Sequence, residues 1–199
     1  IDQEKSILIL APGCPNEKLR EVLFLIKTNE QIAIWEGHKY TKQEGRKISG
    51  IANIQWLDGF EAALKEVVAE ADTVYLNSNE YVKFFPEVPD KNHRFTEQLK
   101  KQFPLHKLAR AAPLLSKLRT IKSEQEIELL REACNITQKG FERILKYTRP
   151  GVHEFEVQAE IDHEFAINRA RGHGYAPIIA SGQNACVLHY IENDEECKD

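Results

Sequence analysis

The chain has 199 residues, a mass of 22.9 kDa and a formal net charge of −4, with 42% hydrophobic and 29% charged residues. This length and composition are typical of one or two soluble globular domains. No apolar run approaches the roughly 20 residues that a membrane-spanning helix needs. A pI of about 6.0 without a cluster of lysine and arginine argues against a nucleic-acid surface. We therefore expect neither a membrane nor a nucleic acid as a partner.

The four cysteines are scattered through the sequence, with neither a C-x-x-C pair nor a histidine partner at zinc-finger spacing. This usage favours a reducing, cytoplasmic compartment. The sequence begins at Ile1, contains no methionine and ends at Asp199 without a helix cap or a polar tail. We therefore expect a fragment that is shortened at both ends.

Short apolar runs separated by turn residues fill the first part of the chain, a pattern typical of interleaved strands and helices. The first two runs flank a Pro-Gly-Cys-Pro loop and are expected to pair antiparallel. The amphipathic run over residues 60–71 predicts a helix, and a helix between two strands indicates a parallel crossover. The sequence thus predicts a mixed α/β sheet. The runs are residues 7–10, 22–26, 31–35, 51–56, 60–71 and 73–76.

The next stretch contains two prolines that predict a loop, followed by three short elements. A helix near the end of this stretch carries Pro113 close to its start, where a missing N–H does least harm. The predicted order is a loop over 84–90, a helix over 93–102, a strand over 105–108 and a helix over 109–118.

A domain boundary is expected between Pro113 and Lys122, which gives domains of residues 1–117 and 118–199. The second domain opens with a capping box, in which the hydroxyl of Ser123 and the carboxylate of Glu126 each bind a free backbone amide. The helix that follows is expected to end at Arg149-Pro150-Gly151 and to bury one stripe. That stripe is Ile127, Leu130, Cys134, Thr137, Phe141 and Ile144.

A second helix is predicted over residues 154–169, with Val157, Ile161 and Phe165 on its apolar face. After Gly172-His173-Gly174 the hydrophobic period changes, and two strands are expected over 175–180 and 185–190, joined by a turn.

Spacing alone identifies few residues suited to chemistry. His189 closes a predicted strand next to a loop, where an imidazole can meet a ligand, although spacing alone favours a histidine that closes a core. Cys186, three residues earlier, would face the opposite side of that strand and makes a poor nucleophile pair. Glu160-Ile161-Asp162-His163 has the Glu-x-x-His spacing of di-metal helical bundles but no second copy. We interpret that helix face, with Glu154, Glu156 and Glu164, as solvated.

A catalytic triad of Ser181, His189 and Asp194 can be drawn, but no glycine pattern of a nucleophile elbow supports it. On spacing alone the sequence indicates a soluble α/β chain of two parts.

Residues 175–190 (Tyr-Ala-Pro-Ile-Ile-Ala-Ser-Gly-Gln-Asn-Ala-Cys-Val-Leu-His-Tyr), with Asn193 and the acidic residues beyond it, resemble the entry to the catalytic domain of the Xaa-Pro aminopeptidases, or aminopeptidase P. Upstream, residues 118–127 resemble the family's domain junction, and 34–37 (Ile-Trp-Glu-Gly) resemble a strand motif of its N-terminal domain. The resemblance runs over nearly the whole chain and is strongest after Pro113.

The resemblance implies a creatinase-like N-terminal domain, a mixed sheet with helices, followed by the beginning of a pita-bread α+β catalytic domain. It implies a peptidase that removes the N-terminal residue from peptides with proline in second position. It further implies two divalent metals, usually Mn²⁺, that share a hydroxide, which attacks the carbonyl of the residue before proline. Their ligands are two aspartates, one histidine and two glutamates, all expected downstream of Asp199, so this chain by itself is expected to bind no metal pair and to be inactive.

Two site residues follow from the same resemblance. His189 is similar to the active-site imidazole that binds substrate and supports the charge that develops on the carbonyl oxygen. Tyr175 matches a residue that lines the pocket for the first substrate side chain. The expected partners are short peptides with an Xaa-Pro N-terminus and further copies of the chain, as a dimer or tetramer.

Two alternative functions remain at this stage. A prolidase, which cleaves Xaa-Pro dipeptides only, shares the metal chemistry and differs in the preferred peptide length. A pita-bread domain without its metal ligands serves as a peptide-binding or scaffold protein, although a retained His189 counts against that interpretation.

Overall fold

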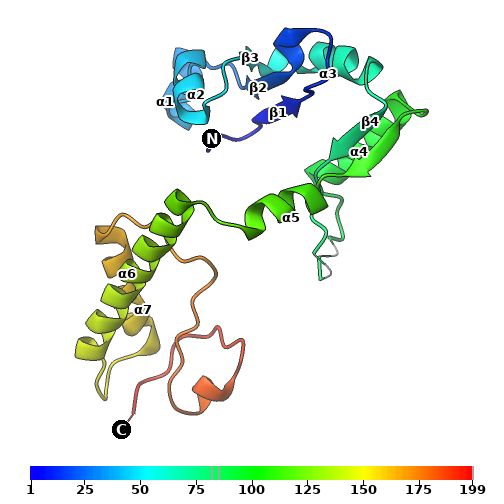
Figure 1. The fold of residues 1–199 in the computed structure, drawn as a ribbon. Helices are drawn as coiled ribbons and strands as arrows, with labels where there is room; N and C mark the ends of the chain where they lie inside the picture. The colour runs from blue at the N-terminus through cyan, green and yellow to red at the C-terminus, as the bar shows by residue number, and fades with distance from the viewer. Residues whose placement is uncertain (82, 85, 199) are drawn as a thin grey trace. The chain divides into compact units, whose positions relative to one another are not determined.

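The computed structural model describes residues 1–81, 83–84 and 86–198. The chain folds as two compact units, Ile1–Leu118 and Arg119–Asp199, each described here by itself. Figure 1 shows the order of their helices and strands along the chain. In the predicted loop over 84–90, Phe85 lies outside the described residues, and so does Asp199. Among the described helices, none is both long and apolar enough to cross a membrane.

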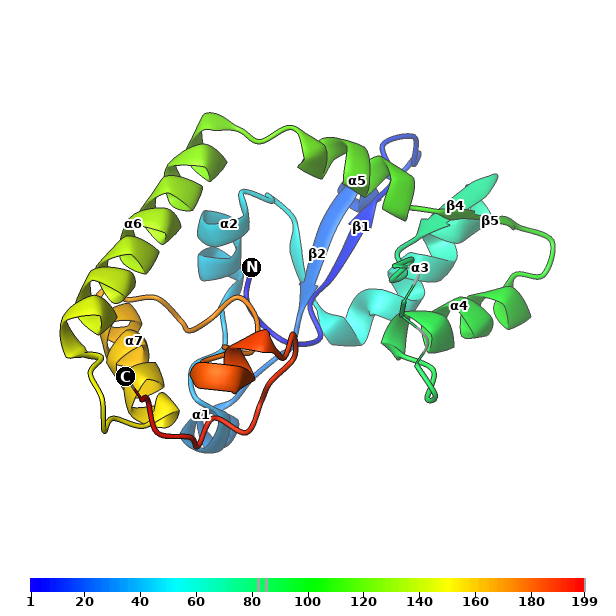
Figure 2. The ribbon, with the colours of Figure 1, turned by 90° about the horizontal axis from the view of Figure 1, so that it is seen from below.

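The first unit begins with a three-stranded sheet of mixed direction in the order β1-β2-β3. β1 (Ile7–Leu10) pairs antiparallel with β2 (Glu21–Leu25), which confirms the expected antiparallel pair. β2 in turn pairs parallel with β3 (Ile54–Trp56), and the three strands lie side by side in Figures 1 and 2. Four consecutive residues of β2 are buried, as expected for a central strand covered on both faces.

Helices rather than a strand fill the connection between β2 and β3. α1 (Glu30–Glu36) and α2 (Lys42–Ser49) lie there, so the expectation of a strand motif at Ile34-Trp35 is wrong. The side chain of Asn29 accepts the amide of Ile32 at 2.8 Å, and Gly37 ends the helix with a φ of +77°. These two caps stabilise a short helix although Ile34 and Trp35 stay exposed, Trp35 by 84%.

A separate two-stranded parallel sheet follows, formed by β4 (Thr73–Leu76) and β5 (Lys107–Arg110). The predicted helix before β4 is present as α3 (Phe60–Ala69), but β3 and β4 belong to different sheets, so the expected crossover within one sheet is wrong. In the second sheet the parallel crossover from β4 to β5 runs through α4 (Lys91–Gln102), which confirms the predicted helix in this stretch. β5 begins two residues later than predicted because residues 103–106 form a turn.

The core of the first unit lies between the first sheet and the helices. Phe24 of β2 is fully buried and meets Phe60 of α3 edge to face, with 5.4 Å between ring centroids. Such an aromatic pair adds about 0.5–1.5 kcal/mol to the burial of the rings. Leu99 of α4 is also fully buried in the same cluster, so the apolar face of α4 packs on it.

Two long helices form the body of the second unit. α5 (Ala112–Thr120), with Pro113 in its first turn as predicted, spans the point at which the two units divide. α6 (Glu124–Tyr147) then begins at the predicted capping box of Ser123 and Glu126. α7 (Glu154–Ile167) packs along α6, as both Figures 1 and 2 show.

The face of α6 that packs on α7 is not the predicted stripe. Ile136 and Gly140 are buried, whereas Phe141 of the predicted stripe is 54% exposed. A Cβ at Gly140 would lie 3.1 Å from Phe165 and 3.2 Å from Ile161, so side chains of α7 occupy the space where this side chain is missing. The space left at a glycine therefore selects the packed face, and the more apolar stripe is left outside this contact.

The two strands predicted over residues 175–180 and 185–190 are not strands. The segment after α7 is irregular, apart from a 3-10 turn over Gly182–Cys186. A strand needs a neighbour to pair its backbone groups, and no described segment forms a ladder with these residues. Polar side chains of α7 hold the segment instead.

Candidate functional site

The candidate site is the segment after α7 and the polar face of α7 that holds it. Glu154, Gln158 and Asp162 recur every four residues along α7 and so share one face. Gln158 accepts a 2.6 Å hydrogen bond from the side chain of Asn193, and Asp162 contacts the imidazole of His173. Glu154, at the first position of the helix, makes the densest set of contacts.

The carboxylate of Glu154 is fully buried and accepts four hydrogen bonds. Oε1 accepts the backbone N–H of Ser181 at 2.6 Å and the Ser181 hydroxyl at 2.9 Å. Oε2 accepts the Tyr190 hydroxyl at 2.6 Å and the backbone N–H of Glu195 at 3.2 Å. Four donors match the lone-pair capacity of one carboxylate, which is how a buried charge is tolerated.

The pKa values of Glu154 and Tyr190 reflect these contacts. Burial by itself raises the pKa of Glu154, but the hydrogen bonds from Tyr190, Ser181 and Glu195 outweigh it and lower that pKa to about 2. Burial and the bond to Glu154 raise the pKa of Tyr190. At neutral pH the carboxylate is therefore ionised and the phenol keeps its proton.

The backbone adds a second connection at the start of α7. The N–H of Glu154 donates to the carbonyl of Glu195 at 3.0 Å, and the N–H of Cys197 donates to the carbonyl of Val152 at 2.8 Å. An isolated antiparallel bridge joins His153 and Glu196. The chain thus returns to the N-terminus of α7 after residue 190, and this return closes residues 181–195 into a loop.

The two sequence-predicted site residues both lie in the irregular segment. His189 occupies a turn that the N–H of Tyr190 closes on the carbonyl of Val187 at 3.4 Å, and its imidazole is exposed. Tyr175 is 83% exposed. His189 directly precedes the buried Tyr190, so of the two residues only His189 is next in sequence to a residue that binds Glu154.

The alternative chemistry weighed from spacing finds no support in these contacts. The Ser181 hydroxyl donates to Glu154, so it is not placed as a nucleophile toward His189. Glu160 pairs with Arg143 of α6, and His163 is exposed. Over the described ranges, no group of three or more His, Cys, Asp or Glu side chains is arranged to hold a metal ion. The described residues therefore do not supply a metal site.

The expectation of a solvated acidic face on α7 is wrong for Glu154, Glu160 and Glu164, whereas Asp162 and His163 are exposed as expected. Glu154 is buried, and Glu160 and Glu164 both face Arg143, with 25% and 14% of their side chains exposed. Sequence reasoning missed Glu154 because its partners lie 27 to 41 residues further along the chain. The available signal was the Glu-x-x-x-Gln-x-x-x-Asp spacing on a helix that also carries an apolar stripe.

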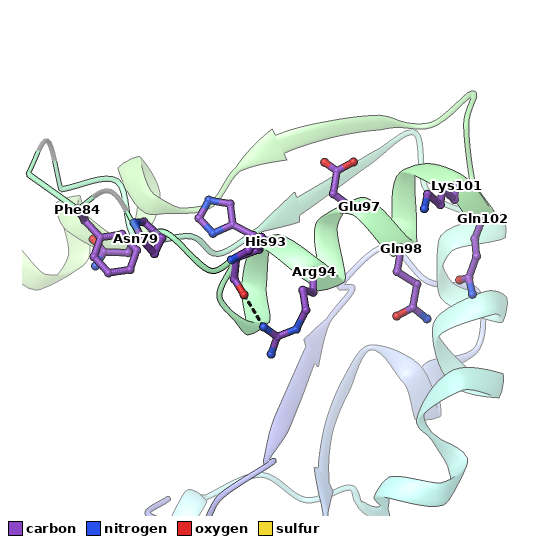
Figure 3. A pocket seen from close by; sticks show the side chains of 10 residues that line it. Asn79, Phe84, His93, Arg94, Glu97, Gln98, Lys101 and Gln102 are labelled. Carbon is purple, nitrogen blue, oxygen red and sulfur yellow. Dashed lines mark hydrogen bonds between the residues drawn. The ribbon is translucent and has the colours of Figure 1, made fainter.

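A separate cavity of about 800 Å³ lies in the first unit, along α4. Figure 3 shows His93, Arg94 and Glu97 on this helix, with Phe84 and Asn79 beside the end that carries His93. The guanidinium of Arg94 donates to the carbonyl of Pro89, drawn as a dashed line in Figure 3. The lining comes from residues 79–102, so neither His189 nor Tyr175 belongs to it.

Comparison with known families accounts for most of the chain. Residues 1–75 match the family described as Aminopeptidase P, N-terminal domain, and residues 128–199 match Metallopeptidase family M24. The resemblance to aminopeptidase P is confirmed. The α/β fold class, an aminopeptidase P N-terminal domain followed by an M24 region, is confirmed with it. His189 and the loop closed by Glu154 lie in the M24 region.

Curated relatives and a solved structure agree with the family matches. The chain is 28% identical to the Xaa-Pro aminopeptidase of Haemophilus influenzae, over 90% of this chain and 40% of that protein. It is 30% identical to the Xaa-Pro aminopeptidase of Escherichia coli, over 100% of this chain and 45% of that protein. The structure of a putative aminopeptidase P from Bacillus anthracis matches with a TM-score of 0.83 at 29% identity, over 89% of this chain and 42% of that one. The chain thus spans less than half the length of these proteins.

Proposed function

We propose that this chain is part of a metal-dependent aminopeptidase that removes the N-terminal residue from peptides with proline in second position. The observation that carries the proposal is the 175–190 segment with His189, which lies within the region that matches family M24. The relatives that align with this chain are named Xaa-Pro aminopeptidase. In the proposal, residues 1–117 form the N-terminal domain and 118–199 the first part of the catalytic domain. Its substrates are short Xaa-Pro peptides, and the protein is a homo-oligomer. We place it in the cytoplasm, in keeping with its four free cysteines.

Within this proposal His189 binds substrate and donates a hydrogen bond to the carbonyl oxygen on which charge develops. His189 is exposed on a turn, and the next residue, Tyr190, is held by its bond to Glu154. This arrangement suits the role, because a hydrogen-bond donor in a constant position stabilises developing charge without first reorganising. Tyr175 contributes an aromatic wall for the first substrate side chain. Two divalent metals, taken as Mn²⁺, would supply a hydroxide nucleophile, and we assign their ligands to sequence beyond Asp199, because the described residues do not fit such a site.

The first test is the coding sequence beyond Asp199. Two aspartates, then a histidine and two glutamates, in that order, support the peptidase. A stop codon at that point, or replacement of those ligands, overturns it in favour of a peptide-binding scaffold.

The second test is an assay of the full-length protein supplied with Mn²⁺. We expect release of the first residue from an Xaa-Pro-Yaa tripeptide and none from the same peptide with alanine in place of proline. Hydrolysis of the Xaa-Pro dipeptide alone would identify a prolidase instead. His189→Ala is expected to lower kcat/KM by about 100-fold, the scale of one lost transition-state donor. His163→Ala, an exposed histidine on α7, is the matched control and should leave the rate unchanged.

A further inference from the structure

The loop that carries His189 is fixed at both ends by a single side chain. Ser181 at its start binds Oε1 of Glu154, and Glu195 at its end binds Oε2. Between them, the hydroxyl of Tyr190 also binds Oε2, and this tyrosine is only 5% exposed. The rest of the turn around His189, by contrast, is exposed: Ala185, Cys186, Val187 and Leu188. The apex of the loop therefore owes its position to contacts at its base.

A carboxylate at position 154 is required by the chemistry of its partners. Two of the four donors are backbone N–H groups, of Ser181 and Glu195, and neither can turn to accept a hydrogen bond. A glutamine of the same shape would direct its NH₂ group at one of these two donors. One end of the loop would then lose its bond inside a buried site, where an unpaired polar group is costly.

We propose that Glu154 is the positioning residue for His189: its carboxylate fixes the turn that presents the imidazole, through Tyr190 on one side and Ser181 on the other. The assignment deepens the proposed function, since it rests on His189 meeting the substrate. Glu154 itself is buried beneath the loop and acts only through it. The low pKa of Glu154 keeps the anchor charged throughout the neutral range.

The anchor is tested by amide hydrogen exchange in the full-length protein, which needs neither metal nor substrate. In Glu154→Gln we expect the amide of Ser181 or of Glu195, whichever faces the new NH₂ group, to exchange at least about tenfold faster, while amides of α7 keep their protection. Glu160→Gln is the matched control, because it removes one negative charge from the same helix at a residue that pairs with Arg143 and not with the loop. It should leave the exchange rates of both loop amides unchanged. Unchanged exchange at both amides in Glu154→Gln would overturn the proposal.

The positioning role is tested by a double-mutant cycle on kcat/KM. If Glu154 acts through His189, then Glu154→Gln should lower kcat/KM about tenfold or more in the wild type, but have no further effect in His189→Ala. The same fold-loss in both backgrounds would show a purely structural role and overturn the inference. An inactive wild-type protein would instead refute the proposed function, and amide exchange then decides the anchor alone.

If α7 itself loses protection in Glu154→Gln, two milder variants take its place. Tyr190→Phe and Ser181→Ala each remove one hydroxyl donor from the carboxylate and keep every backbone bond. Each is expected to accelerate exchange at the Glu195 or Ser181 amide, respectively, and to follow the same cycle with His189→Ala. Loss of activity that adds fully to that of His189→Ala would overturn the proposal here too.

Discussion

The hydroxyl of Tyr190 donates a 2.6 Å hydrogen bond to Oε2 of Glu154, across 36 positions of sequence. Both groups are buried, and the bond joins the first turn of α7 to the residue that follows His189. A negative charge at a helix N-terminus is also favoured by the helix dipole. This contact links the pair of helices α6 and α7 to the segment that carries the candidate catalytic imidazole of His189.

Removal of that hydroxyl should destabilise the second unit. Tyr190→Phe keeps the ring but takes one donor from a buried carboxylate, so we expect a loss of about 1–3 kcal/mol in the free energy of unfolding. Urea denaturation followed by circular dichroism measures it. Tyr175→Phe is the matched control, because that ring is 83% exposed and its hydroxyl lies in water. Equal stability of Tyr190→Phe and the wild type would contradict the structure.

Stability should also fall in acid because of Glu154. The pKa of this carboxyl is about 2 in the folded chain against 4.5 ordinarily, so between these values the unfolded chain binds more protons. Its contribution is complete above pH 4.5 and is lost as the pH falls towards 2. The stability gap between wild type and Glu154→Gln should therefore narrow from pH 7 to pH 3, as measured by urea denaturation at both values. A gap that is independent of pH would show that the carboxylate is not stabilised by folding.

The start of α6 offers a local test. Ser123→Ala removes the hydroxyl that accepts the amide of Glu126, and we expect a loss of about 1 kcal/mol, typical of an N-cap. Ser123→Asp keeps an acceptor at the same position and should retain most of the stability. Thermal denaturation of the three proteins makes the comparison. If Asp and Ala proved equally destabilising, the cap would not be the cause.

The crossing of α6 and α7 depends on the missing side chain at Gly140. A valine there would place atoms into the 3.1 Å space before Phe165, and we expect about 1–3 kcal/mol of destabilisation from overpacking. Ala133→Val, at an exposed position of the same helix, controls for the helix propensity of valine. Chemical denaturation should show a larger loss for Gly140→Val. The reverse order would place the helix contact elsewhere on α6.

Local chemistry in the sequence determined the elements that need few partners. The capping box at Ser123 lies within three residues of its partner Glu126, and the helix of Val157 and Ile161 follows from their spacing. The antiparallel pair of β1 and β2 is similarly close in sequence. The order of residues 175–190 was enough to identify the family resemblance, because a long motif can be matched without its geometry.

Only the tertiary structure decided which polar groups are buried and which helix face is packed. Glu154 has the composition of a solvated face, yet donors from Ser181 to Glu195 bury it, and no local pattern predicts contacts 27 to 41 residues away. Periodicity likewise gave α6 an apolar stripe but not its partner, since the approach at Gly140 depends on α7. Whether a charged side chain is buried, and which face of a helix is packed, depends on groups that are distant in the sequence. Only folding brings those groups together.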